Sequence, residues 1–176
     1  MVSKGEAGVA AEATATATPA RLPAFGHHPF SGTARTRVEA SGRLALPATF
    51  KTAFTDAAIV RSGGAQCLFL MTPRAFELVV DALKANDPDM MLDNRKRQLL
   101  FMGSPRISVD RQSRIVLPPE LRAKVGLEGD SEVVVAGAIE RLEIWPAARY
   151  DAEQAALVDD VDRMFETFGG LSTDPM

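Results

Sequence analysis

The sequence predicts an α+β fold in which two related halves of one chain interlock into a single β-barrel. Three observations support this prediction. One motif occurs twice, short apolar runs with strand-like alternation occur in both halves, and apolar residues recur at helical spacing between the halves and near the C-terminus. Self-similarity sets the architecture, because each copy forms one structural unit. With 176 residues, 46% of them hydrophobic, the chain can bury a core.

The repeated motif spans residues 39–50 and 110–121, and the two copies align without a gap. The first copy reads EASGRLALPATF and the second reads DRQSRIVLPPEL. Each contains an acidic residue, three further residues, an arginine, an alternating apolar run and a proline. The motif acids are Glu39 and Asp110. The arginines are Arg43 and Arg114.

Each copy is predicted to form a turn, a strand and a short helix. The acid opens the turn, and the small or polar residues after it tolerate turn dihedral angles. Pro47 or Pro118 stops the strand and suits the first turn of a helix. Apolar residues four positions apart then share one helical face: Phe50 with Phe54, and Leu121 with Val125. Gly126 suits the end of the second short helix.

In the first half, residues 35–38 are predicted to form a short strand that leads into the motif. Residues 57–61 and 67–71 are two further strands. Gly63-Gly64 lies between them and favours a hairpin turn. Cys67, the one cysteine of the chain, is expected in the core, and a single cysteine excludes an intramolecular disulfide.

The second half repeats this arrangement. Residues 106–109 are predicted to be the entry strand. Residues 131–137 and 141–145 are predicted to form the closing hairpin, equivalent to the hairpin of the first half. Trp145, in the last strand, is expected in the core.

Two helices are predicted between the copies. Thr72 caps the first, with Pro73 in its first turn, and an apolar stripe follows at helical spacing. The stripe, expected to be core, consists of Phe76, Val79, Val80 and Leu83. The second helix is predicted over residues 90–102 and is stopped by Gly103. Its charged stretch at residues 93–98 could touch phosphate, but a solvated face or ion pairing with a neighbouring chain is the favoured interpretation.

A further helix is predicted near the C-terminus, ended by Gly169-Gly170. Its apolar stripe must pack on its own domain or on another subunit. The stripe consists of Leu157, Val161, Met164, Phe165 and Phe168. No stretch reaches the roughly 18 apolar residues of a membrane span, and no signal peptide is expected.

Residues 1–24 are rich in alanine and threonine without apolar periodicity, which predicts disorder. His27 and His28 are adjacent and lack nearby ligand candidates, so a linker is favoured over a metal site. The predicted domain organisation is a disordered N-terminal extension (1–28), a first half-domain (29–76), inter-repeat helices (77–104), a second half-domain (105–148) and an acidic C-terminal helix and tail (149–176).

Charge is unevenly distributed along the chain. The formal net charge is −3, which by itself argues against a nucleic-acid partner. However, residues 150–176 contain seven acidic residues and one basic residue, so the preceding part of the chain is net positive. The acidic tail is a partner-binding helix or a solubilising one. Both motif copies also lie among other cations, so two small basic patches are expected on two related turns. The alternative is that each arginine only forms an ion pair with the acid four residues earlier.

Further motifs accompany the repeat. Phe30-Ser31-Gly32 is an F-x-G motif near the start of the first half. The second half closes with Gly126-Leu127, then VVVAG and RLEIW. Together with the paired motifs and their "LP" steps, this pattern over roughly residues 30–150 resembles the MraZ family, within the wider AbrB-like group. The chain departs from the family pattern at three positions: Glu39 replaces aspartate, Ser41 replaces the usual lysine, and Ser113 replaces a common glycine.

The resemblance implies a swapped-hairpin β-barrel of two AbrB-like half-domains with both arginine turns on one face. It implies a sequence-specific transcriptional regulator that binds double-stranded DNA at direct repeats upstream of its own cell-division and cell-wall operon. Arg43 and Arg114 would pair with guanine in the major groove. Further contacts to phosphate or bases would come from Arg35, Arg37, Ser41, Arg111 and Gln112. The two motif acids, Glu39 and Asp110, belong to the same turns.

The resemblance also implies a ring-like homo-oligomer, with the inter-repeat and C-terminal helices as the candidate subunit contacts. A cytoplasmic, nucleoid-associated protein without cofactor, metal, membrane or small-molecule substrate is expected. An enzyme is disfavoured, since no nucleophile–base pair or phosphate-binding glycine loop is evident. The stronger alternative is an antitoxin-like or protein-interaction module that sequesters a partner through its C-terminal helix.

Overall fold

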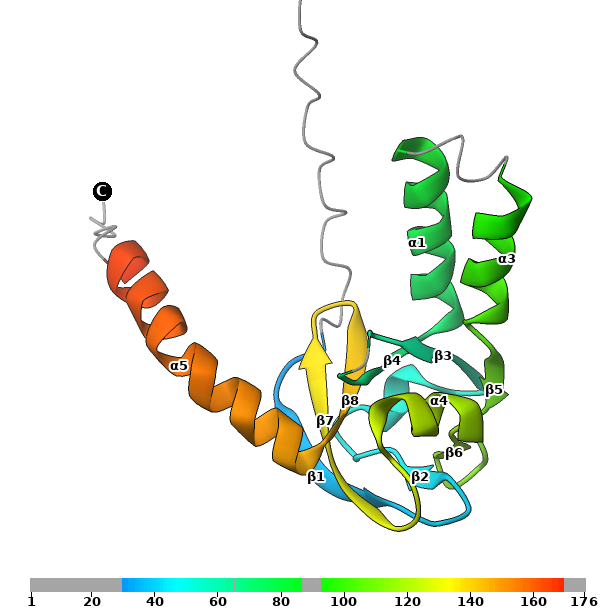
Figure 1. Cartoon of the computed structure of the whole chain (residues 1–176), viewed down its shortest axis with the longest axis horizontal. Helices are drawn as coiled ribbons and strands as arrows, with labels where there is room; N and C mark the ends of the chain where they lie inside the picture. Colours follow the sequence, from blue (N-terminus) through cyan, green and yellow to red (C-terminus); the bar gives the residue numbers. More distant parts are fainter. Residues whose placement is uncertain (1–29, 65, 87–92, 170–176) are drawn as a thin grey trace, which may run out of the picture.

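The computed structural model describes residues 30–64, 66–86 and 93–169, and in the last helix it leaves out the side chains of residues 158–162 and 164–169 (Figure 1). The strands are β1 (Thr33–Val38), β2 (Arg43–Ala45), β3 (Ala57–Ser62), β4 (Leu68–Met71), β5 (Arg106–Ser108), β6 (Arg114–Val116), β7 (Ser131–Ala138) and β8 (Arg141–Pro146). The helices are η1 (Lys51–Ala53), α1 (Pro73–Asn86), α3 (Asn94–Met102), α4 (Pro119–Val125) and α5 (Ala147–Gly169). The expected extension at residues 1–28, with His27 and His28, lies outside the described residues.

The strands form one antiparallel sheet that is nearly closed into a barrel. Their order is β5-β3-β4-β8-β7-β1-β2-β6. The two outermost strands in this order meet at the second motif turn, where the Asp110 amide donates to the Arg114 carbonyl over 2.9 Å. The predicted α+β barrel is therefore confirmed.

Most strand pairs join one half of the chain to the other. β1 pairs with β7, β5 with β3, β4 with β8, and β2 with β6. Only β1–β2, β3–β4 and β7–β8 are pairs within one half. This exchange of strands is the swapped-hairpin arrangement that the resemblance implies. Neither half can complete a sheet alone, because its outer strands find their partners in the other half.

A pseudo-two-fold axis passes through the β2–β6 pair. Leu44 lies opposite Ile115, which occupies the same position in the other motif copy. The flanking hydrogen bonds obey the same symmetry. The Leu46 amide donates to the Ser113 carbonyl, and the Leu117 amide donates to the Gly42 carbonyl, both over 2.9 Å.

The barrel interior is filled by apolar side chains from both halves. The motif residues Phe50, Phe54, Leu121 and Val125 are buried there, as their spacing predicts. Cys67 is also buried, and burial raises the pKa of its thiol to about 12. The thiol therefore stays protonated and unreactive at neutral pH.

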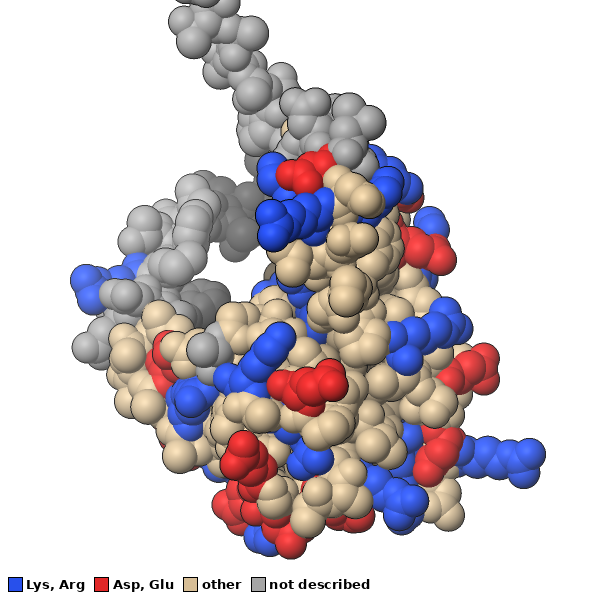
Figure 2. Space-filling model, turned by 45° about the vertical axis from the view of Figure 1, so that its right-hand side comes forward, with Lys and Arg blue, Asp and Glu red and all other residues tan. Residues whose placement is uncertain are grey.

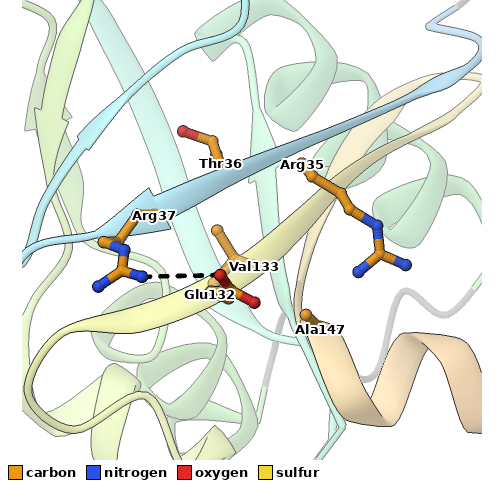
Figure 3. A pocket seen from close by; sticks show the side chains of 6 residues that line it. All are labelled: Arg35, Thr36, Arg37, Glu132, Val133 and Ala147. Carbon is orange, nitrogen blue, oxygen red and sulfur yellow. Dashed lines mark ion pairs between the residues drawn. The ribbon is translucent and has the colours of Figure 1, made fainter.

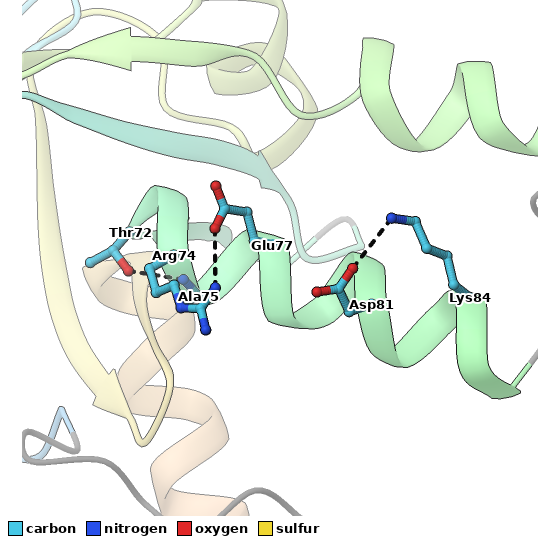
Figure 4. Close-up of polar contacts among 6 residues, drawn as sticks. All are labelled: Thr72, Arg74, Ala75, Glu77, Asp81 and Lys84. Atoms are coloured by element: carbon cyan, nitrogen blue, oxygen red, sulfur yellow. Dashed lines mark hydrogen bonds and ion pairs between the residues drawn. The ribbon is translucent and has the colours of Figure 1, made fainter.

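The helical insert rises from the barrel and shares a second, smaller core with Ile59 of β3 and Met71 of β4. Phe76 and Val80 of α1 pack with Leu100 of α3, and Val79 and Leu83 lie against them. The Thr72 hydroxyl accepts from the Ala75 amide over 3.1 Å, so it is the predicted cap (Figure 4). Exposed ion pairs along α1, such as Lys84 with Asp81 at 3.3 Å, stabilise it little.

Helix α3 begins at Asn94, capped by Asp93, which accepts from the Arg95 and Lys96 amides. Gly103 ends it, as predicted. Residues 90–92, where the sequence also predicts helix, lie outside the described residues. The charged stretch at residues 93–98 is exposed, which agrees with a solvated face.

Two local predictions are wrong. After the first motif copy, the predicted short helix is only the single 3-10 turn η1, whereas the second copy forms α4. The first copy has Thr49 and Thr52, whose branched side chains disfavour helix, and it lacks the left-handed glycine that Gly126 provides for α4. Trp145 is only partly buried and lies outside both core clusters, because Leu142 and Ile144 take the inward positions of β8 and strand alternation places Trp145 on the outer face, edge-on to Tyr150 of α5 at 6.2 Å.

Helix α5 projects from the barrel on the side opposite α1 and α3 (Figure 1). Leu157, the first residue of the predicted apolar stripe, is 46% exposed. The side chains of Val161, Met164, Phe165 and Phe168 lie outside the described part. Among the described helices, none has the length and apolarity to cross a membrane.

Candidate nucleic-acid interface

The β2–β6 ribbon brings the two motif arginines together. Arg43 lies opposite Val116, and Arg114 lies opposite Ala45. Direct partners of an antiparallel pair share one face, and residues two apart on a strand share it as well. Leu44 and Ile115 are buried, so the arginines point outward. Their positions are diagonal neighbours, roughly 7–8 Å apart. Figure 1 shows β2 and β6 away from α1 and α3, so the insert does not cover this ribbon.

Neither guanidinium is bound to the motif acid. Within the described part of the chain, Arg43 and Arg114 are exposed, and no side-chain hydrogen bond or ion pair engages either guanidinium. Instead, Asp110 Oδ1 accepts from the amides of Gln112 and Arg114, both over 2.8 Å. The Asp110 side chain thus fixes the turn by binding the backbone amides of the turn, and the arginine guanidinium stays exposed to solvent.

The first turn is held differently. Glu39 is one methylene longer than aspartate, and among the described residues its carboxylate accepts from the Ser41 hydroxyl, at 3.3 Å, and not from the turn amides. A contact without a counterpart in the second turn is made by the Ala40 amide, which donates to Asp130 Oδ1 at 2.9 Å, in the loop that precedes β7. Asp130 therefore positions the first motif turn. No local sequence signal could have identified it, because its partner lies in the other half of the chain.

Both turns need a left-handed backbone at the residue before the arginine. Gly42 has φ 84° and its symmetry mate Ser113 has φ 58°. At Gly42 a side chain is also excluded by space, since a Cβ would lie 2.8 Å from the Leu117 carbonyl oxygen. Serine at position 113 therefore carries strain that glycine avoids in the first copy.

We predict that Ser113→Gly raises the free energy of unfolding by about 0.5–1 kcal/mol, because relief of the left-handed strain exceeds the added flexibility of the unfolded chain. Gln112→Gly is the matched control, since Gln112 is in the same turn with φ outside the left-handed region. It should lower the stability by about 0.5–1 kcal/mol. Urea unfolding measures both, and an equal loss in the two variants would show that Ser113 is unstrained.

Arg122 has a structural role in this site. Its Nε donates to the Leu117 carbonyl at 3.3 Å, and its Nη1 donates to the carbonyls of Ala40 and Leu127 at 3.4 Å. It thereby ties α4 to the motif turn of the other half. Its counterpart in the first copy, Lys51, is exposed. One cation of the expected basic patch is thus committed to the backbone.

Arg35 and Arg37 lie on β1, on the outer surface of the barrel. Arg37 forms an ion pair with Glu132 at 3.6 Å, and Arg35 pairs with Asp151 of α5. Both arginines line a shallow cavity of about 290 Å³ together with Glu132 and Ala147 (Figure 3). Both arginine side chains are 61% exposed. Exposed pairs of this kind are weak, so a phosphate could displace either carboxylate.

The remaining predicted contacts lie at the turns. Ser41, Arg111 and Gln112 are exposed beside the two motif arginines. On the face seen in Figure 2, basic and acidic side chains are interspersed, and the described residues there form no single basic field. In the described part of the chain, no group of His, Cys, Asp and Glu could hold a metal ion. The cations of this site are therefore separate side chains on the turns and the ribbon, without a continuous basic surface on the face shown.

Comparison with known proteins identifies similar chains. A family model for the MraZ protein, described as antitoxin-like, matches residues 100–167. The transcriptional regulator MraZ of Thermobifida fusca is 35% identical over 128 residues, which cover 71% of this chain and 88% of the relative. That of Thermomicrobium roseum is 35% identical over 123 residues, covering 68% and 83%. That of Clavibacter michiganensis subsp. michiganensis is 30% identical over 139 residues, covering 77% and 96%.

Proposed function

The chain belongs to the MraZ family of transcriptional regulators, and from this premise we propose that it binds double-stranded DNA through the β2–β6 ribbon and catalyses no reaction. The observation that carries the proposal is the pair of outward arginines at the pseudo-two-fold axis, neither of which is paired among the described residues. An antiparallel two-stranded ribbon fits the major groove, where arginine pairs bidentately with guanine O6 and N7. Arg43 and Arg114 are the proposed base-reading residues.

The neighbouring side chains would position the ribbon on the duplex. Arg35, Arg37 and Arg111 would bind phosphates, and Ser41 and Gln112 would add phosphate or base contacts. For Arg35 and Arg37 this requires exchange of a carboxylate for a phosphate. Because phosphate contacts release counterions, binding should weaken as salt rises.

One chain has few cations with which to bind a duplex. We therefore propose a homo-oligomer, a ring in the form expected from the family, that binds several direct repeats at once. Linked sites raise the effective concentration of each further contact. The target would be repeats upstream of its own cell-division and cell-wall operon, and the protein would act in the cytoplasm on the nucleoid.

A gel shift at fixed salt tests the proposal. The purified protein is titrated onto its own upstream region and onto scrambled DNA of equal length. Selective binding supports a sequence-specific regulator. Equal, salt-sensitive binding to both would indicate a nonspecific architectural role. Absence of binding to either would contradict the proposal and favour an antitoxin-like module that acts on a protein partner.

We predict that deletion of residues 151–176 reduces the number of subunits in the oligomer, if α5 is a subunit contact as proposed. Leu157 is 46% exposed in one chain, and an exposed apolar residue on a projecting helix is available to a neighbouring subunit. Light scattering gives the particle mass, and division by the mass of the truncated chain gives the subunit number. Deletion of residues 170–176 alone is the control and should leave the subunit number unchanged. An unchanged subunit number in the longer deletion would exclude α5 from the subunit contact.

A further inference from the structure

The outer face of the β2–β6 ribbon is not symmetric. The axis relates Arg43 to Arg114, and it relates Ala45 to Val116. The charged pair is identical, but the apolar pair differs in size. Val116 is 52% exposed, although it is a large apolar residue on the face that carries the two arginines. The two ends of the ribbon thus present the same cation beside different apolar surfaces.

We propose that Val116 is a specificity-determining residue that recognises the C5-methyl group of a thymine next to the guanine contacted by Arg43. The inference rests on the proposed DNA binding by this ribbon. Val116 is the direct partner of Arg43, so their Cβ atoms lie roughly 5 Å apart. Successive base pairs are about 3.4 Å apart. When Arg43 reaches a guanine, Val116 therefore faces the adjoining base pair.

The chemistry of the Val116 side chain determines which group on the DNA it can recognise. Valine has no hydrogen-bonding atom, and the thymine methyl is the apolar feature of the major-groove edge. Branching at Cβ restricts the χ1 angle of the side chain, so it presents a defined surface. Ala45, beside Arg114, lacks this reach. The DNA contacted by each arginine forms one half-site. The half-site of Arg43 would therefore require a thymine beside the guanine that Arg43 contacts, and the half-site of Arg114 would not.

Substitution of single thymines by deoxyuridine tests this inference, because it removes only the methyl group. The bound site is first footprinted on the upstream DNA. Each thymine in the footprint is then replaced singly, and the dissociation constant is measured at fixed salt. For the parent protein, one thymine should be sensitive, with a loss of about three- to fivefold. This thymine should adjoin the guanine whose substitution no longer matters in Arg43→Ala.

Two variants provide the decisive comparison. Val116→Ala should lose the same factor on thymine DNA and become indifferent to deoxyuridine at that position. Ala45→Val should gain a second sensitive thymine, in the half-site under Arg114. Circular dichroism checks that both variants fold. The inference is overturned if no thymine is sensitive in the parent, or if Val116→Ala keeps the sensitivity. Failure of the proposed function is distinguishable, since no selective footprint would then form, and that result would overturn both.

Discussion

Replacement of Arg43 or Arg114 by alanine is expected to weaken selective DNA binding by about 1–3 kcal/mol for each site, with the fold unchanged. Each guanidinium is exposed and, among the described residues, unpaired, so its removal leaves no buried group without a partner. The two losses should be similar, because the arginines occupy symmetry-related positions on one ribbon. A gel shift at fixed salt measures the effect, and the double variant should retain only salt-sensitive, nonspecific binding.

Two control variants make the result interpretable. Arg74→Ala removes an equally charged, exposed side chain from α1, where Arg74 pairs with Glu77, and it should leave DNA affinity nearly unchanged (Figure 4). Arg43→Lys keeps the charge but loses the planar fork that matches guanine. It should preserve the salt dependence and lose selectivity. If both alanine variants bind like the parent, the arginines do not read DNA and the proposed mechanism is wrong.

Leu44→Ala is expected to lower the free energy of unfolding by about 2–5 kcal/mol. Leu44 is 0% exposed and lies on the pseudo-two-fold axis against Ile115, which is 1% exposed. A cavity there removes contacts of both halves at the point where they join. Ile115→Ala should cost a similar amount. Such a loss is a large fraction of the stability of an ordinary domain, about 5–15 kcal/mol.

Leu99→Ala is the control, because Leu99 on α3 is 74% exposed and the chemical change is the same. Surface substitutions usually fall within about 0.5 kcal/mol. Urea unfolding at one fixed protein concentration measures all three variants, since association also contributes to stability. A loss at Leu44 no larger than at Leu99 would contradict the assignment of the axis as the centre of the fold.

The elements that the sequence predicts are those whose start, turn or end is specified by residues close together in the chain. Gly63-Gly64 specifies the β3–β4 hairpin, Thr72 and Pro73 specify the start of α1, and Gly126 specifies the end of α4. The resemblance to the MraZ family is confirmed by relatives that align along most of their length. The alternating apolar residues of the motif also identify the buried faces of β2 and β6.

Other features could not be predicted, either because two local signals compete or because the partner is distant in the chain. Repeat symmetry predicts a helix after the first copy, yet only a 3-10 turn forms there. Trp145 is expected in the core, but the alternation of β8, in which Leu142 and Ile144 are buried, places it on the outer face. At the site, the spacing of acid and arginine suggests an ion pair, whereas Asp110 binds the turn amides instead. The ion pair of Arg35 with Asp151 joins opposite ends of the described chain.

The exchange of strands between the halves has a consequence for biosynthesis. Residue 33 pairs with residue 136, so β1 leaves the ribosome long before its partner β7 has been translated. β3 likewise waits for β5, and β4 for β8. Pairings this distant slow folding, and unpaired strand edges readily recruit other chains. A nascent first half therefore cannot mature alone, and the barrel closes only when β8 has emerged, so the chain most needs protection between the emergence of β1 and that of β8.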